Sequence, residues 1–417
     1  MAGEVTLQCA LGKPNVPVAN VPQLAYVLIE AKPTGVVANV QMPVNFSLVL
    51  DHSGSMGGEK LRGLKEAVKL VLDQMQPQDY VSLVIFDDNA KLVSPSQPVT
   101  DKARLKSLVD GIQDQGGTEM SKGMQLGLTE VRKALAPTRV SRILLLTDGQ
   151  TYGDEARCKQ LAGDAGGLGV PITALGLGDD WNEALLDAIA QASNGVSDFV
   201  DTPSKVQQFF QAALQSMQAT VVSNANLILR LVGGVTPRQV WRVVPLITQL
   251  SPKVLSDRDV QVPLGDLESG TGQAVLVELM LPARPAGRYR IAQAEVSYDV
   301  PAAGIAGEKA RSDILMTFAD DPALTQQYDA RVMNLVEKVT AFKLQTRALQ
   351  DAQAGNTAGA TQKLRAAATR LLDMGETDLA AAAEAEAQRL EQGQGMSAAG
   401  TKKLQYQTRK LTQKLEP

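Results

Sequence analysis

Histidine and cysteine are nearly absent from this sequence, and long apolar runs are missing altogether. The 417 residues include one histidine, His52, and two cysteines, Cys9 and Cys158. Because the cysteines lie far apart, we expect no disulfide framework and predict two buried thiols in different domains. No apolar run approaches the roughly 20 residues that a membrane helix needs, and no basic start followed by an apolar stretch marks a secretory signal. These absences predict a cytoplasmic protein without membrane contact.

A strong excess of charge of either sign is also lacking. The chain carries 41 Lys and Arg residues against 45 Asp and Glu residues, a formal net charge of −4. This balance creates no global field that would favour nucleic acid or an anionic membrane. The final segment, 401–417, is locally basic, but no row of aromatic side chains accompanies it. We interpret it as a solvated helix face over an apolar stripe of Leu404, Leu411 and Leu415, and we do not expect nucleic acid as a partner.

The scarcity of histidine limits the catalytic chemistry available to the chain. Ser-His and Cys-His nucleophile systems would have to use His52, which is adjacent in sequence to Ser53. Neighbouring side chains rarely point at each other. The chain contains no G-x-x-x-x-G-K-[ST] loop, and segment 176–181 lacks the third glycine of a dinucleotide-binding loop. The sequence therefore gives little support to a hydrolase of these types or to a nucleotide-binding protein.

Oxygen-bearing side chains, in contrast, follow directly after an apolar run. Asp51, Ser53 and Ser55 stand just beyond residues 46–50, which have the composition of a buried strand. A D-x-S-x-S loop offers one charged and two neutral oxygens. Hard cations such as Mg²⁺ prefer oxygen ligands and usually keep some positions for water. The loop therefore has the ligands of a divalent-cation site, with open positions that a partner could fill.

Further ligands are expected where other strands end, because sites in open α/β sheets form where strand ends meet at a switch in strand order. Thr118 follows two glycines and precedes a helical stretch, and Asp148 follows the apolar run 143–146. Singly, Thr118 could be a helix N-cap, Asp148 part of an Asp-Gly turn, and D-x-S-x-S a capping turn. Together they form one candidate set of metal ligands: Asp51, Ser53, Ser55, Thr118 and Asp148.

At these five positions the chain resembles the von Willebrand factor A (VWA) domain family, of the bacterial type. The family's metal-ion-dependent adhesion site is the pattern D-x-S-x-S, then Thr, then Asp, and it is intact here. The similarity extends from about Pro43 to Ser216 and includes segments 84–90 and 172–178. The resemblance implies hydroxyl ligands at Ser53, Ser55 and Thr118, and carboxylates at Asp51 and Asp148 that act directly or through water. It also implies bound Mg²⁺, Mn²⁺ or Ca²⁺.

Apolar strands and amphipathic helices alternate within residues 43–217. In the helix expected over 59–75, apolar residues recur at i, i+3 and i+4, whereas Lys60, Lys65, Glu66 and Lys69 are expected to face water. Such alternation with short connections predicts a doubly wound, mostly parallel, Rossmann-like sheet covered on both faces.

Strand patterns flank this region on both sides. Segments 4–12 and 23–32 precede it, and strand-like runs separated by Pro and Gly turns return between 226 and 318. Two strands are not stable alone, so we expect them to join the later sheet. The VWA domain would then be inserted in an antiparallel β-sandwich, an arrangement similar to the inserted domains of integrin β chains. A separate amino-terminal arm is the alternative.

The region after Pro322 is predicted to be helical. Residues 357–372 and 377–390 resemble one tetratricopeptide-type hairpin, which we expect to pack on the sandwich. The predicted domains are therefore the amino-terminal strands (1–42), the VWA domain (43–217), the rest of the β-sandwich (218–320) and a carboxyl-terminal helical region (321–417).

These patterns predict a non-enzymatic, metal-dependent protein-binding module. A partially liganded cation would bind an Asp or Glu that a partner protein presents, and His52, Met56 and Tyr152 are candidate rim residues. One alternative is a Mg²⁺-dependent phosphohydrolase with Asp51 as nucleophile, as in haloacid dehalogenase-like enzymes. Their D-x-D motif, however, has an acid where this chain has Ser53, and serine cannot protonate a leaving group in that way. A second alternative is an intracellular scaffold with a purely structural metal.

Overall fold

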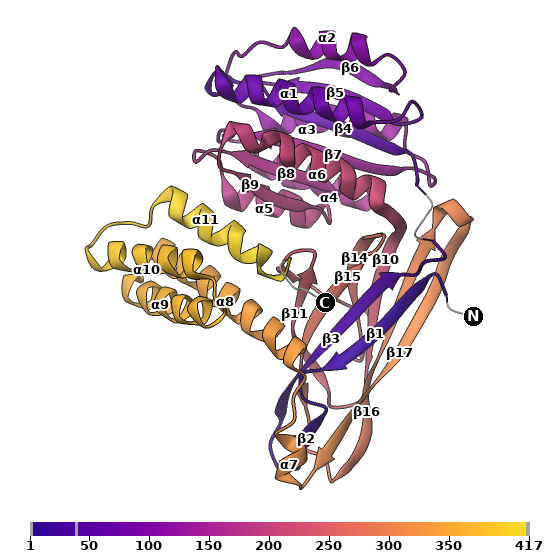
Figure 1. The fold of residues 1–417 in the computed structure, drawn as a ribbon, viewed down its shortest axis with the longest axis vertical. Helices are drawn as coiled ribbons and strands as arrows, with labels where there is room; N and C mark the ends of the chain where they lie inside the picture. The colour runs from indigo at the N-terminus through magenta and orange to yellow at the C-terminus, as the bar shows by residue number, and fades with distance from the viewer. Residues whose placement is uncertain (1–2, 38–40, 414–417) are drawn as a thin grey trace. The chain divides into compact units, whose positions relative to one another are not determined.

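The computed structural model describes residues 3–37 and 41–413 of the chain. By its internal contacts the chain divides into two compact units. One is Val40–Val221, and the other joins Met1–Asn39 to Val222–Pro417. Figure 1 labels their helices and strands. Each unit is described by itself.

A six-stranded sheet with the order β6-β5-β4-β7-β8-β9 forms the centre of the unit Val40–Val221 (Figure 1). Neighbouring strands are parallel, except that the edge strand β6 runs antiparallel to β5. All residues of β4 and β7 are buried, as expected for central parallel strands covered on both faces. The strands are β4 (Val44–Asp51), β5 (Tyr80–Phe86), β6 (Ala90–Pro98), β7 (Val140–Thr147), β8 (Ile172–Leu177) and β9 (Val196–Val200).

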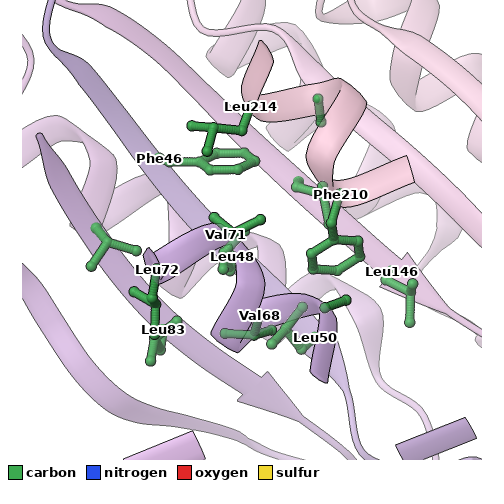
Figure 2. Packing of buried hydrophobic residues seen from close by; sticks show 14 of the residues in the cluster. Phe46, Leu48, Leu50, Val68, Val71, Leu72, Leu83, Leu146, Phe210 and Leu214 are labelled. Carbon is green, nitrogen blue, oxygen red and sulfur yellow. The ribbon is translucent and has the colours of Figure 1, made fainter. Parts of the chain in front are cut away.

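Helices cover both faces of this sheet. The apolar stripes of α1, α2 and α6 share one core with alternate residues of β4, namely Phe46, Leu48 and Leu50. Figure 2 shows Val68 and Phe210, from α1 and α6, in this core. Helix α3 packs on the other face of β4 and β5. The helices are α1 (Glu59–Gln74), α2 (Lys102–Asp110), α3 (Met120–Lys133), α4 (Glu155–Gly167), α5 (Glu183–Ala192) and α6 (Val206–Ala219), with 3₁₀ turns η1 (Gly54–Met56) and η2 (Pro203–Lys205).

Two glycines allow α3 to lie very close to the sheet. A Cβ atom at Gly127 would stand 2.3 Å from Cγ2 of Val49, and one at Gly123 would stand 2.6 Å from Cδ1 of Phe86. Any larger side chain would push the helix away from β4 and β5. Thr118 lies two residues before α3, so the close packing of this helix brings the loop that carries Thr118 near the sheet.

The second unit contains two further sheets, which are mostly antiparallel. Their strand orders are β1-β3-β15-β11-β12 and β13-β14-β10-β16-β17-β2. Strand β3 pairs with both β1 and β15, so the two amino-terminal strands belong to a sheet that also contains later strands. The elements are β1 (Val5–Leu11), β2 (Asn15–Pro17), β3 (Gln23–Pro33), β10 (Thr220–Leu231), β11 (Thr236–Val244), β12 (Thr248–Leu250), β13 (Lys253–Val254), β14 (Asp259–Glu268), β15 (Gln273–Leu281), β16 (Gly287–Val300), η3 (Pro301–Ala303) and β17 (Ile305–Ala319).

Helices complete this unit and share a core with one of its sheets. Leu28, Trp241 and Leu276 of that sheet belong to the same apolar cluster as the buried residues of α8, α9 and α10. Arg331 of α8 pairs with Glu30 of β3, at 2.6 Å between nitrogen and oxygen. The helices are α7 (Pro322–Thr325), α8 (Ala330–Gln353), α9 (Thr357–Asp373), α10 (Thr377–Glu391) and α11 (Ala398–Arg409), followed by η4 (Lys410–Thr412).

The predicted α/β fold class, with antiparallel sheets and carboxyl-terminal helices added, is confirmed, but some details were wrong. Cys158 is buried, whereas Cys9 is only partly buried; both are free thiols. Lys402 in α11 is 1% exposed, so the basic terminal helix is not simply solvated. Leu404 and Leu411 are buried as expected, and Leu415 lies outside the described residues.

The short strands β2, β12 and β13 were not predicted, because two or three residues show no periodicity.

Within the described residues, no helix combines the length and the apolar character needed to cross a membrane.

Candidate metal centre

Asp51 is the last residue of β4, and its carboxylate is fully buried. The backbone N–H of Ser53 donates to Oδ1 at 2.8 Å, and the Thr147 hydroxyl donates to Oδ2 at 2.6 Å. Burial raises the pKa of Asp51, and the nearby charge of Asp148 acts in the same direction, whereas the hydrogen bonds from Ser53 and Thr147 oppose both effects. The carboxylate is therefore fixed in orientation by one donor from the loop that follows β4 and one from the end of β7.

The two serines connect this loop to the end of β7. Ser53 Oγ lies 3.1 Å from Ser55 Oγ, and Ser55 Oγ donates to Asp148 Oδ1 at 2.7 Å. Asp148 directly follows β7 and is 1% exposed, while Ser55 is exposed. A row of hydrogen-bonded oxygens thus runs from the buried Ser53 through Ser55, an exposed residue, to the buried carboxylate of Asp148.

Thr118, in the loop before α3, lies close to Ser55 and to the end of β7. A Cβ atom at Gly149 would lie 3.5 Å from Thr118 Oγ1 and 3.9 Å from Ser55 Oγ, so both hydroxyls border the Gly149 backbone. The backbone N–H of Gly54 donates to the Gly116 carbonyl at 3.1 Å, which ties the two loops together. The structure therefore gathers all five candidate residues at the carboxyl ends of β4 and β7.

The spacing and the chemistry of these oxygens fit a divalent cation. Adjacent ligands of an octahedral ion with bonds of about 2.1 Å are roughly 3.0 Å apart, and the two oxygen separations in the site are 3.1 and 2.7 Å. In the part of the chain that the structure describes, no group of three or more His, Cys, Asp or Glu side chains is placed to hold a metal. A cation here would therefore need the hydroxyls as well as the carboxylates.

Neighbouring residues hold the start of α3 in place. The Thr151 hydroxyl donates to Asp154 Oδ1 at 2.5 Å, and the other oxygen of Asp154 accepts from the Ser121 backbone N–H at 2.7 Å. The Met120 backbone N–H donates to the Thr151 hydroxyl at 3.2 Å. These contacts satisfy N–H groups that would otherwise be unpaired at the helix start. They link the loop that carries Asp148 to the helix that follows Thr118.

Two residues of the site were missed by the sequence reasoning. Lys60 was expected to face water, yet its ammonium lies 2.5 Å from Asp148 Oδ2. Thr147 belongs to an apolar run and gave no polar signal, although its hydroxyl holds Asp51. Nothing in the helical pattern could have placed Lys60 beside a strand that ends 87 residues later.

The three candidate rim residues differ sharply in exposure. Met56 is fully buried and His52 is 3% exposed, so neither forms an accessible rim, whereas Tyr152 is 80% exposed. Nδ1 of His52 lies 2.8 Å from the Gln113 carbonyl oxygen, and Nε2 lies 3.7 Å from Asp87 Oδ2. The imidazole is thus engaged with Gln113 and Asp87 rather than with a serine hydroxyl.

Comparisons with known proteins agree with this architecture. The family model of the von Willebrand factor type A domain matches residues 45–212, and that of the Sll0103-like, C-terminal alpha-helical domain matches residues 330–414. The uncharacterized protein sll0103 of Synechocystis is 31% identical over 372 residues, with 87% of each chain covered. Human inter-alpha-trypsin inhibitor heavy chain H3 is 28% identical over 187 residues, which are 41% of this chain and 21% of that protein.

Among solved structures, a von Willebrand factor type A protein from Catenulispora acidiphila has a similar fold over the whole chain. The TM-score is 0.78 at 19% sequence identity, with 97% of this chain and 96% of that chain covered. At this identity the likeness concerns the fold alone.

Proposed function

The chain belongs to the family of von Willebrand factor A domain proteins that includes Synechocystis sll0103, and from that membership we propose that it is a non-enzymatic, metal-dependent protein-binding module. The observation that carries the proposal is the row of oxygens from exposed Ser55 to buried Asp148. These oxygens would bind a cation, and one side of that cation would remain open to solvent. A partner would present an Asp or Glu side chain to that open side.

The five residues would act as two kinds of ligand for Mg²⁺, Mn²⁺ or Ca²⁺. Ser53, Ser55 and Thr118 would contribute neutral hydroxyls, and the buried carboxylates of Asp51 and Asp148 would contribute charge directly or through water. A bound cation would supply an electrophilic position for the carboxylate of the partner. Because hydroxyl ligands neutralise none of the positive charge, that position would remain attractive to an anion. Tyr152, which is 80% exposed in the loop that follows Asp148, would contact the partner.

Three features favour binding over catalysis. His52 is engaged with Gln113 and Asp87, so it is not arranged to activate Ser53. Both oxygens of Asp51 accept hydrogen bonds, from Ser53 and Thr147, which constrains the residue that a phosphohydrolase would use as nucleophile. The serine at position 53 also leaves that mechanism without its second acid.

For the second unit we infer that its two sheets face each other as a β-sandwich into which the VWA domain is inserted. Strand β14 lies against β3 and β15, and β1 lies against β17, so strands of the two sheets are in contact. We propose domain boundaries near residues 42, 217 and 320.

Metal titration tests the proposed function. We expect Mg²⁺ or Mn²⁺ to raise the melting temperature of the intact chain, by several degrees once the concentration is about 100 times Kd, where linkage gives about 2.7 kcal/mol. Asp51→Ala should show no such rise. Asp73→Ala, which removes an exposed carboxylate of α1 that pairs with Lys106, is the matched control and should respond like the native protein.

Failure of the native protein and Asp51→Ala to differ in metal response would contradict the proposal. Turnover of an aryl phosphate that Asp51→Asn abolishes would favour the phosphohydrolase instead. A metal-dependent rise in melting temperature without metal-dependent capture of any partner carrying a critical Asp or Glu would favour the structural scaffold.

A further inference from the structure

Lys60 is placed differently from the other lysines of its helix. It is the second residue of α1, and its ammonium lies 2.5 Å from Asp148 Oδ2. Its side chain is 30% exposed, whereas that of Asp148 is completely buried. Lys69, by comparison, pairs with Glu66 and Asp110, whose carboxylates are 52% and 60% exposed. Of these two lysines, Lys60 is the one that contacts a residue of the candidate metal centre.

The contact engages the second carboxylate oxygen of Asp148. Oδ1 accepts the hydroxyl of Ser55, and Oδ2 accepts the ammonium of Lys60. A divalent cation that approaches Asp148 therefore competes with a cation that the protein already supplies. The lysine is tethered, so it competes at a high effective concentration that dilution cannot change.

The charge balance of the site changes accordingly. Two ionised carboxylates, Asp51 and Asp148, would give the site a charge of −2, and the ammonium of Lys60 reduces this to −1. With a divalent cation added the sum is +1, which a carboxylate from a partner would neutralise. Without Lys60 the metal alone would neutralise the site. Repulsion between two cations a few ångströms apart is substantial in a partly buried site.

We propose that Lys60 is a built-in competitor for the metal, which lowers the affinity of the site for a divalent cation and leaves the metal-bound site electropositive. The inference rests on the proposed function, because it assigns a role toward the same cation. On metal binding the ammonium gives up Asp148 and turns outward, which its partial exposure and its flexible four-carbon stem permit. The metal-bound site is then electropositive. It therefore binds metal more tightly when an acidic partner is also bound than when the metal is bound alone.

Titration of Mn²⁺ alone into the full chain and its variants tests this role. Lys60→Met keeps most of the length of the side chain, one atom fewer, without the charge, and we expect it to lower the Kd for Mn²⁺ at least tenfold. The metal-free melting temperature of Lys60→Met should fall, because Asp148 loses its cation. Lys60→Arg should keep the native Kd within about threefold. Lys69→Met is the control on the same helix and should leave the Kd unchanged.

A readout in the unmodified protein avoids any dependence on a variant that fails to fold. Acylation of lysines by an N-hydroxysuccinimide ester, followed by mass spectrometry, reports how accessible each ammonium is. We expect Mn²⁺ to accelerate labelling of Lys60 severalfold and to leave labelling of Lys69 unchanged. Labelling of Lys60 that is unchanged or slower with Mn²⁺ would overturn the proposal.

The outcomes separate this inference from the proposed function. Equal or weaker Mn²⁺ binding by Lys60→Met, while the native protein binds, overturns the role of Lys60 alone. Binding by Lys60→Met but not by the native protein supports the role of Lys60 and overturns metal-dependent capture by the native chain. Absence of Mn²⁺ binding in both proteins overturns both.

Discussion

Asp51 depends on a single side-chain hydroxyl from the adjacent strand. Thr147 donates to Oδ2 at 2.6 Å, and the two residues end the neighbouring parallel strands β4 and β7. A buried carboxylate that loses such a donor retains the full cost of its desolvation. Thr147 therefore stabilises the charged form of a candidate metal ligand without being a ligand itself.

Replacing Thr147 by valine tests this contact. Thr147→Val is nearly isosteric but removes the donor, so we expect the free energy of unfolding to fall by about 1–3 kcal/mol and metal binding to weaken. Thr129→Val, on the exposed face of α3, removes a hydroxyl that bonds only its own helix and should change little. Urea denaturation with and without Mg²⁺ measures both effects. Equal stability of the two variants would show that the contact with Asp51 contributes nothing.

At the scale of elements, one buried carboxylate joins three strands of the second unit. Glu295 of β16 is 1% exposed and bonds Arg230 of β10 and Arg311 of β17; Lys309 of β17 lies 3.3 Å away. Burial alone would raise the pKa of Glu295, but hydrogen bonds from Arg311, Lys309 and Arg230 outweigh it and hold the pKa at about 2. The ion cluster thus fixes the order β10-β16-β17 through charge as well as through backbone pairing.

The depressed pKa of Glu295 predicts a specific acid sensitivity. Its contribution to stability is complete above the ordinary value of 4.5 and is lost as pH falls through about 2. We expect Glu295→Gln to reduce the free energy of unfolding by roughly 2 kcal/mol at pH 6, a value discounted because its partners are half exposed. The difference from the native protein should shrink between pH 4.5 and 2.

Urea denaturation of the full chain at pH 6, 5, 4 and 3 would follow this difference. Glu308→Gln, at an exposed position of β17, is the control and should track the native protein. A difference that stays constant across the pH range would contradict the role of ionised Glu295.

The predictability of the elements depended on their length and on the face they bury. The expected helix 357–372 corresponds to α9, Thr357–Asp373, because its apolar residues repeat with helical spacing over many turns. Strands β12 and β13, of three and two residues, gave no such signal. Lys60 was misplaced for a related reason. A helical pattern tells which residues avoid the core, but not which distant strand end lies beside the exposed face.

At the scale of the whole molecule, the unit Val40–Val221 has a self-contained core. Its apolar cluster runs from Met42 before β4 to Met217 in α6 and draws all its residues from this unit. All five candidate metal ligands lie within it as well. The cytoplasmic location and the exclusion of nucleic acid, which rest on composition, stay predictions.

This separation predicts that residues 40–221 fold independently of the rest of the chain. We expect the fragment to unfold in one cooperative transition and to bind Mn²⁺ with a Kd within about threefold of that of the full chain, because no ligand or core residue is removed. Calorimetry measures both quantities, and the same fragment with Asp51→Ala is the control. A fragment that folds but no longer binds Mn²⁺ would show that the site requires the second unit.

The pairing of β3 with β15 has a consequence for how the protein is made. Gln273 follows Pro33 by about 240 residues, so at about 5–20 residues per second a ribosome completes the partner strand roughly 12–48 s after β3. Throughout that interval the segment Val27–Ala31, which is apolar except for Glu30 and is buried in the finished protein, has an open edge on a nascent chain. A cell that synthesises this protein must therefore shield one hydrophobic hairpin for as long as it takes to translate a whole domain.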